Sequence, residues 1–114
     1  MNLFVEPNHF VLASTAESIR VPHDMAAYVE GRSSIGRLGL QVQNAGFIDS
    51  VFHGQITLEL ENQSGFPIVL KEGVRICQIV FVQMSRSGEQ SYNGKYCGQS
   101  GATPSRLEVD PEFT

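Results

Sequence analysis

The segment Gln55–Glu61 alternates strictly between apolar and polar side chains, and it constrains the fold more than any other part of the chain. Successive side chains of a β-strand point to opposite faces of the sheet, so this pattern predicts a strand with one buried face. The predicted buried residues are Ile56, Leu58 and Leu60. The intervening polar residues would lie on the opposite face.

Further strands are predicted in several segments, each bounded by turn-forming Gly, Pro or Asn residues. Val74–Val82 is the strongest of these, and its nearly continuous apolar character indicates a more buried strand. Only Ser33–Leu38 is predicted to form a helical turn. Many short strands at this spacing indicate an all-β sandwich or barrel. The weaker strand predictions are Phe10–Ala13, Ala26–Glu30, Leu38–Gln43 and Ile68–Leu70.

The composition fits one small domain. A chain of 114 residues, 41% of them hydrophobic, can build a single modest core. Its net charge of -4 gives no basic face for a phosphate backbone, so polymeric nucleic acid is not an expected partner. We find no apolar run long enough to span a bilayer and no leader-like N-terminus. We therefore expect no membrane association and a cytoplasmic location.

The cysteine and histidine residues do not follow a metal-binding pattern. Cys77 and Cys97 form no CxxC motif, and His9, His23 and His53 are scattered along the chain. We expect no zinc site, and no zinc-dependent deaminase chemistry, which requires a His or Cys and a Cys pair around a Glu. Because Cys77 lies in an apolar run, we interpret it as a buried thiol.

The segment Gly31–Gly39 combines three glycines, two serines and two arginines. Backbone amides, hydroxyl groups and guanidinium groups can together cradle phosphates. The segment is not a P-loop, because Arg37 and Leu38 stand where that motif has a Lys and a magnesium-binding hydroxyl. On composition alone, the alternative to a phosphate site is a Gly-rich turn whose arginines are solvated.

Two polar residues stand on otherwise apolar strands. Glu59 lies in the middle of the alternating strand, and Gln78 interrupts the second apolar run. A buried Gln needs hydrogen-bond partners, so the two residues indicate a shared polar pocket. The alternative is that Glu59 simply faces solvent. Asp49, which follows an apolar pair before this strand, is a further candidate carboxylate. Lys95 and Gln99, near the C-terminus, are a candidate cation and a candidate amide for the same site.

Four blocks of the sequence follow one another along the chain: Glu30–Gly39, Ala45–Asp49, Gly54–Leu60 and Lys95–Thr103. Together they resemble the dCTP deaminase branch of the dUTPase superfamily. The resemblance implies a distorted antiparallel β-barrel, or jelly roll, of the dUTPase type that forms a homotrimer with its sites between subunits. Residues 1–114 would form one domain. Composition favours a floppy tail after Ser85, whereas the resemblance makes residues 85–114 an arm that closes over the nucleotide.

The resemblance also implies a reaction, the zinc-independent hydrolytic deamination of dCTP at cytosine C4. Glu59 would act as general base and proton shuttle for the attacking water, and Ser33 and Arg37 would hold both in place. Asp49 matches a carboxylate beside the deoxyribose, which in dUTPases aligns a water for attack on phosphorus. Because Ala45–Asp49 is more similar to the bifunctional type, dUMP and pyrophosphate are the predicted products, and dUTP is the alternative product.

The nucleotide-binding residues follow from the same resemblance. The Gly-rich segment would contact the phosphates. Gln78, Tyr92, Lys95 and Gln99 would contact the remaining triphosphate and sugar atoms. Magnesium would arrive on the triphosphate, with no protein cage of carboxylates, and dTTP is a candidate inhibitor. The predicted set is Arg32, Ser33, Ser34, Ile35, Gly36, Arg37, Asp49, Thr57, Leu58, Glu59, Gln78, Tyr92, Lys95 and Gln99.

Two other functions stay open at this point: a dUTP pyrophosphatase without deaminase activity, and a non-catalytic nucleotide-binding or regulatory protein. Met1–Val5 matches the middle of the family's chain, so the resemblance is to an N-terminally short member. Ser50 and Val51 replace the Pro-Gly pair that is common after the aspartate, so the local turn is expected to differ.

Overall fold

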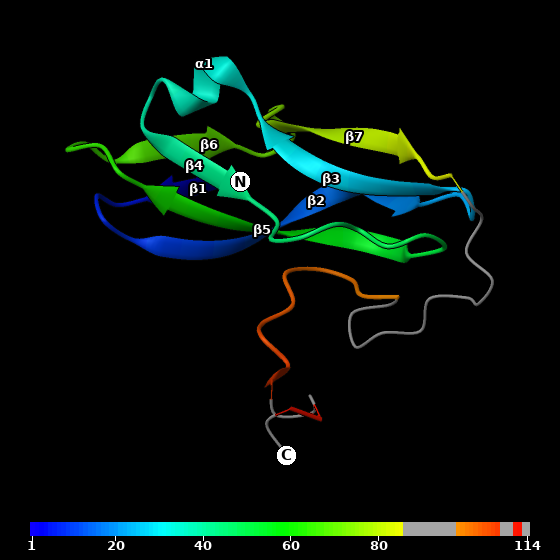
Figure 1. Ribbon diagram of the computed structural model, residues 1–114. Helices are drawn as coiled ribbons and strands as arrows, with labels where there is room; N and C mark the ends of the chain where they lie inside the picture. The colour runs from blue at the N-terminus through cyan, green and yellow to red at the C-terminus, as the bar shows by residue number, and fades with distance from the viewer. Residues whose placement is uncertain (86–97, 108–110, 113–114) are drawn as a thin grey trace.

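The computed structural model describes residues 1–85, 98–107 and 111–112. These residues confirm the predicted all-β class, and none of their helical structure is long and apolar enough to cross a membrane. Figure 1 shows one short helix beside the strands. The elements are β1 (Asn2–Val5), β2 (Phe10–Arg20), β3 (Met25–Gly31), α1 (Ser33–Gly36), β4 (Leu40–Gln43), β5 (His53–Asn62), β6 (Ile68–Lys71) and β7 (Cys77–Gln83).

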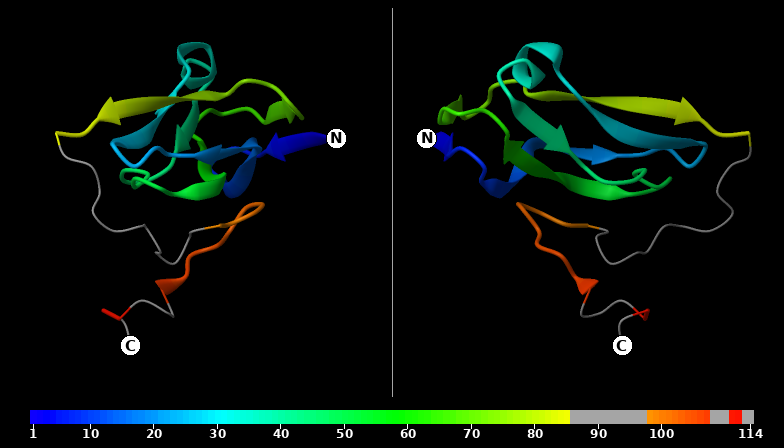
Figure 2. Two further views of the ribbon diagram at one scale, coloured as in Figure 1. Left: turned by 90° about the vertical axis from the view of Figure 1, so that its right-hand side faces the viewer. Right: turned by 60° about the vertical axis from the view of Figure 1, so that its left-hand side comes forward.

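The strands pair into three antiparallel sheets, so the predicted single barrel is not formed by the described residues. β5 is the central strand of the largest sheet, in the order β2-β5-β4, while β1 pairs with β6 and β3 with β7. β4 is short and covers only Glu59–Asn62 of β5. Figures 1 and 2 show the β3–β7 pair on one side of the β2–β5 pair and residues 98–107 on the other.

β2 extends well beyond the predicted Phe10–Ala13. A β-bulge interrupts the alternation of its side chains after this first part. Its pairing with β5 shifts register between Ser14 and Ser18. Across this irregularity the Ile56 amide donates to the Thr15 hydroxyl oxygen over 3.0 Å. A bulge adds residues to one strand and breaks the alternation of its side chains. The second half of β2 therefore has no clear strand signal in the sequence.

The core confirms the alternation that was predicted for β5. Ile56, Leu58 and Leu60 are only 3%, 2% and 0% exposed. The prediction of a buried strand over Val74–Val82 is wrong in two respects. The strand begins only at Cys77, and the exposed fractions of Phe81 and Val82 are 44% and 41%. β7 pairs with β3 alone, so its apolar residues do not all meet the core.

Asn62, at the end of β5, is a fully buried polar residue that ties β1 to the turn before β6. Its Nδ2 donates to the carbonyl oxygens of Val5 and Phe66, each over 2.8 Å. Its Oδ1 accepts from the amide and the hydroxyl of Ser64, also over 2.8 Å each. Because every polar atom of the side chain is paired, its burial is tolerated in the core.

Candidate active site

A cavity of about 440 Å³ opens between β5, the loop from β4 to β5, and residues 99–105. It brings together four of the predicted site residues, namely Asp49, Thr57, Glu59 and Gln99. Thr57 is buried and Glu59 is half-buried, so this face of β5 is not simply open to solvent. Thr57 and Glu59 therefore contribute polar groups to a cavity that apolar side chains also line.

Glu59 is held by the loop that follows β4. The Ala45 amide donates to Glu59 Oε2 over 3.2 Å. Next to it, Asn44 Nδ2 donates to the carbonyl oxygen of Thr57 over 2.8 Å. The loop is thus fastened to β5 at the Glu59 carboxylate and at the backbone of Thr57. Hydrogen bonds of this kind fix the orientation of a reacting group before the substrate binds.

Gln99 lies against the part of β5 that β4 leaves uncovered. The Gln55 amide donates to the Gln99 carbonyl oxygen over 3.0 Å, and Gln99 Nε2 donates to the Gln55 carbonyl oxygen over 2.7 Å. Gly54 permits this approach, since a Cβ at its position would lie 2.7 Å from the Gln99 carbonyl oxygen. Within the described residues, Gln99 Oε1 is buried without a hydrogen-bond partner, so it can accept one from a ligand.

Asp49 stands at the start of a tight corner. The Phe52 amide donates to the Asp49 carbonyl oxygen over 3.2 Å, and the Val51 amide donates to Val21 over 3.0 Å. Val51 has a φ of 58°, a left-handed conformation that is unfavourable for a β-branched residue. The hydrogen bond to Val21 thus holds Val51 in a backbone conformation that glycine adopts easily. Glycine is the residue that is common at this position in the family.

The cavity also has aromatic side chains on its rim, which the sequence reasoning missed. Phe10 and Phe47 line it although they are 62% and 64% exposed. The Tyr28 ring contacts Phe47 edge-on, with ring centroids 5.8 Å apart. Exposed rings beside polar groups are suited to stack on a planar ligand. The available signal was the position of Phe47 immediately after the Ala45-Gly46 turn.

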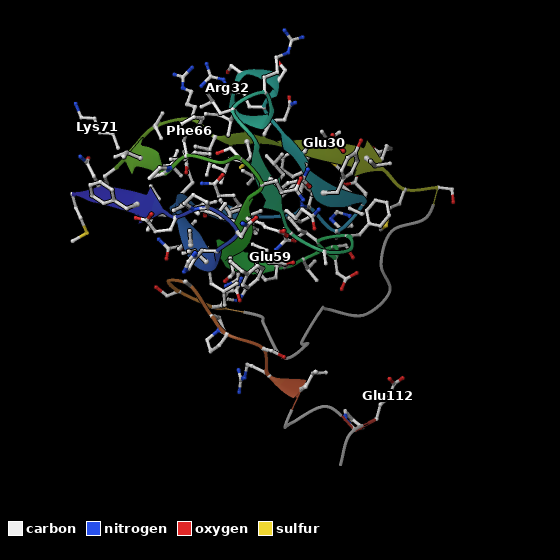
Figure 3. All side chains as sticks on the ribbon, turned by 90° about the vertical axis from the view of Figure 1, so that its left-hand side faces the viewer. Glu30, Arg32, Glu59, Phe66, Lys71 and Glu112 are labelled. Carbon is white, nitrogen blue, oxygen red and sulfur yellow. The ribbon has the colours of Figure 1, made fainter. Side chains whose placement is uncertain are left out.

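The remaining described site residues lie elsewhere in the chain. α1 forms within the predicted segment, and the Arg37 amide donates to the Ser33 carbonyl oxygen over 2.9 Å. Arg32 Nη1 donates to the Arg75 carbonyl oxygen over 2.6 Å. Figure 3 shows Arg32 and Glu59 on opposite sides of the domain. Within one chain, no residue of the Gly-rich segment lines the cavity.

Gln78 belongs to this second group, so the predicted pocket shared by Glu59 and Gln78 is wrong for a single chain. Its Nε2 donates to the Gly31 carbonyl oxygen over 3.2 Å. The physical reason is that β5 and β7 lie in different sheets. Two further predicted residues, Ile35 and Leu58, have buried side chains in the core and can reach a ligand only through their backbones. Tyr92 and Lys95 lie outside the described residues, as do residues 86–97, 108–110 and 113–114 of the predicted arm.

Two titratable groups outside the cavity have shifted pKa values. Cys77 is half-buried, which raises the pKa of its thiol. The pKa of Asp24 is lowered, because Gln83 Nε2 donates to its carboxylate over 3.0 Å. This contact fastens the end of β7 to the start of β3. Cys97 lies outside the described residues.

Comparison with solved structures defines the class of the fold. The native dUTPase of EIAV matches with a TM-score of 0.65 and 26% identity, over 82% of this chain and 78% of that one. A mutant dUTPase of Staphylococcus bacteriophage 80alpha with dUpNHpp matches with a TM-score of 0.66 and 15% identity, over 83% and 79%. The molecule is therefore an all-β domain with a dUTPase-like fold.

The chain belongs to the dCTP deaminase-like family, whose model matches residues 1–84, and this confirms the resemblance found in the sequence. The dUMP-forming dCTP deaminase of Aquifex aeolicus (strain VF5) is 53% identical over 96% of this chain and 61% of the relative. That of Sulfurihydrogenibium sp. (strain YO3AOP1) is 51% identical over 93% and 59%. The chain spans about three fifths of the length of these curated relatives.

Proposed function

We propose that this protein deaminates dCTP at cytosine C4 without zinc and then cleaves the triphosphate, giving dUMP and pyrophosphate. The carrying observation is Glu59, half-buried in the cavity and hydrogen-bonded by the Ala45 amide. Relatives at 53% and 51% identity are named dCTP deaminase, dUMP-forming, which supports this reaction over the alternatives. We place the protein in the cytoplasm, together with its deoxynucleotide substrate.

In the first step Glu59 takes a proton from a water, and the water oxygen forms a bond to C4. The tetrahedral intermediate then receives protons through the same carboxylate, and the C4–N bond breaks to release ammonia. One water is consumed, and the base becomes uracil. The Ala45 amide keeps Glu59 oriented throughout, because it is a fixed backbone donor.

In the second step Asp49 would align another water for attack on the α-phosphorus, and pyrophosphate leaves. Asp49 lines the same cavity as Glu59, which supports a sequence of two hydrolyses on one bound nucleotide. Its backbone is held by the Phe52 amide and, through Val51, by Val21. A carboxylate on such a fixed corner loses little entropy when it orients a water.

We propose that a homotrimer completes the site. The family resemblance places Ser33 and Arg37 beside the glutamate. In one chain Ser33 begins α1 and Arg37 follows its last residue, and neither lines the cavity that contains Glu59. A neighbouring copy would bring its own α1 to this cavity. The exposed apolar residues Phe81 and Val82 on β7 give such a contact apolar surface to bury.

Magnesium would be carried by the triphosphate. Mg²⁺ prefers oxygen ligands and commonly retains waters and substrate phosphates when a protein binds it. Asp49 and Glu59 both line the cavity, so carboxylate oxygens would lie beside an ion that arrives with the nucleotide. In the chain itself, the guanidinium groups of Arg32 and Arg37 would pair with phosphate oxygens.

The trimer proposal is tested by mixing two inactive variants, Glu59→Gln and Arg37→Ala, under conditions that exchange subunits. If each site draws Glu59 from one copy and Arg37 from another, random mixing restores about a quarter of the wild-type sites. No recovery from a mixture shown by sizing to be trimeric would contradict shared sites. A monomer with full activity would also contradict them.

The reaction itself is tested by incubating the full chain with dCTP or dUTP and magnesium and resolving the products. We expect dUMP from dCTP, and we expect Glu59→Gln to abolish deamination while Glu61→Gln, an exposed residue of the same strand, leaves it unchanged. Conversion of dUTP but not dCTP would select the pyrophosphatase, which the dUTPase-like fold also supports. Binding without turnover would select the regulatory alternative.

A further inference from the structure

We infer that Gln55 is a positioning residue that fastens residues 98–103 to β5 and thereby builds one wall of the cavity. The effect on the nucleotide rests on the proposed function, whereas the fastening itself does not. Gln55 does not line the cavity. It would act through Gln99 and Thr103, which do line it.

The Gln55 side chain connects two segments that are far apart in the sequence. Its Oε1 accepts from the Gly101 amide over 2.6 Å and, at longer range, from the Ser100 hydroxyl over 3.4 Å. Its Nε2 donates to the Ala16 carbonyl oxygen over 3.4 Å, and Ser14 Oγ lies 3.3 Å from Oε1. One half-buried amide thus joins the bulge of β2 to the C-terminal segment.

The β2 bulge offers an acceptor to the other half of the Gln55 amide. The register of β2 against β5 shifts between Ser14 and Ser18, so residues 15–17 have no regular partners in the ladder. Gln55 supplies a donor to Ala16 and keeps its oxygen for Gly101. An unpaired polar group in a partly buried place is costly, so a side chain that satisfies both segments stabilises both.

Thr57 continues the attachment two residues further along β5. The Thr103 amide donates to Thr57 Oγ1 over 3.0 Å. On the other side of Gln55, the Gly98 amide donates to the His53 carbonyl oxygen over 2.8 Å. Residues 98–103 therefore run along the edge of β5 that β4 does not cover, with Gln55 in the centre of the contact. At its end Thr103, followed by Ser105, lines the cavity that contains Glu59.

Hydrogen exchange of the full chain, without nucleotide, tests the fastening. Gln55→Asn keeps an amide but is one methylene too short for Gly101, so the Gly101 amide should exchange about tenfold faster. Gln55→Glu keeps the acceptor and should retain slow exchange at Gly101. Gln41→Asn, an exposed residue of β4, is the matched control and should behave as wild type. Equal exchange at Gly101 in Gln55→Asn, Gln41→Asn and wild type would overturn the inference.

Steady-state kinetics test the consequence for the nucleotide. We expect Gln55→Asn to raise the KM for dCTP about tenfold with a smaller change in kcat, because the wall contacts the ligand and not the reacting water. Gln55→Glu should restore KM. Faster exchange at Gly101 with an unchanged KM would overturn the role in binding. If the wild type turns over no dCTP, the proposed function fails, and the exchange comparison still decides whether Gln55 holds the segment.

Discussion

Replacing Asn62 with Ala should destabilise the fold by about 2–4 kcal/mol. The side chain is 0% exposed and makes four hydrogen bonds of 2.8 Å. A net hydrogen bond contributes about 0.5–1.5 kcal/mol, and a buried group left unpaired costs about 1–3 kcal/mol. The carbonyl oxygen of Val5 would lose this donor in a fully buried place, since Val5 itself is 0% exposed. The partners in Ser64 and Phe66 can instead reach water.

Urea unfolding followed by circular dichroism measures this loss. We expect Asn62→Ala to lower the midpoint with an unchanged m-value, because the native and unfolded surfaces stay the same. The neighbouring Gln63→Ala, at an exposed position, should change the free energy of unfolding by less than about 0.5 kcal/mol. A loss below about 1 kcal/mol for Asn62→Ala would refute the reasoning that this side chain fastens β1 to the β5–β6 turn.

Three further predictions concern single positions. Val51→Gly should leave the free energy of unfolding within about 0.5 kcal/mol of wild type or raise it, because glycine tolerates the left-handed φ. The control Val69→Gly, at an exposed site of β6, should lower the free energy of unfolding by about 1 kcal/mol. A larger loss for Val51→Gly than for Val69→Gly would contradict the claim that the backbone of Val51 is strained. Phe47→Ala should raise the KM for dCTP severalfold with little change in thermal stability, and Phe66→Ala, in the exposed turn, should change neither. Burial raises the pKa of Cys77, so the contribution of its thiol to stability is complete below the ordinary thiol pKa and is lost as pH rises through the higher folded pKa. The melting temperature should therefore fall more between about pH 8 and pH 10 in wild type than in Cys77→Ala. Parallel curves of melting temperature against pH would contradict this.

The fold class and the centre of the site could be predicted from the sequence. The alternation of β5 has a period that only a strand satisfies, so it placed Ile56, Leu58 and Leu60 in the core and Glu59 on the other face. The Gly-rich segment likewise produced the expected helical turn at α1. In both cases the local pattern and the tertiary environment favour the same structure.

The remaining features depend on contacts that no local pattern records. The bulge of β2 removes its alternation, so the second half of that strand was missed. Hydrophobicity overestimated the burial of β7, because an apolar strand that pairs only with β3 leaves Phe81 partly exposed. Gln78 was placed with Glu59 because both are polar residues on apolar strands, but which sheet each strand joins is decided by long-range pairing.

Sequence reasoning also missed Gln55, although it stands in the clearest strand of the chain. Its role depends on Ala16 and Gly101, which the fold brings to it from opposite directions along the sequence. Polar residues on an alternating strand look alike in the sequence, and only their neighbours in space distinguish Gln55, Thr57 and the exposed Glu61.

Deamination of dCTP in water enriched in ¹⁸O tests the central claim most directly. If Glu59 activates a water for attack at C4, mass spectrometry of the dUMP product will show one ¹⁸O atom in the uracil base. Glu59→Gln should give no labelled base, and Glu61→Gln should give as much as wild type. Unlabelled uracil, or labelled uracil formed at the wild-type rate by Glu59→Gln, would contradict the proposal that this carboxylate is the base.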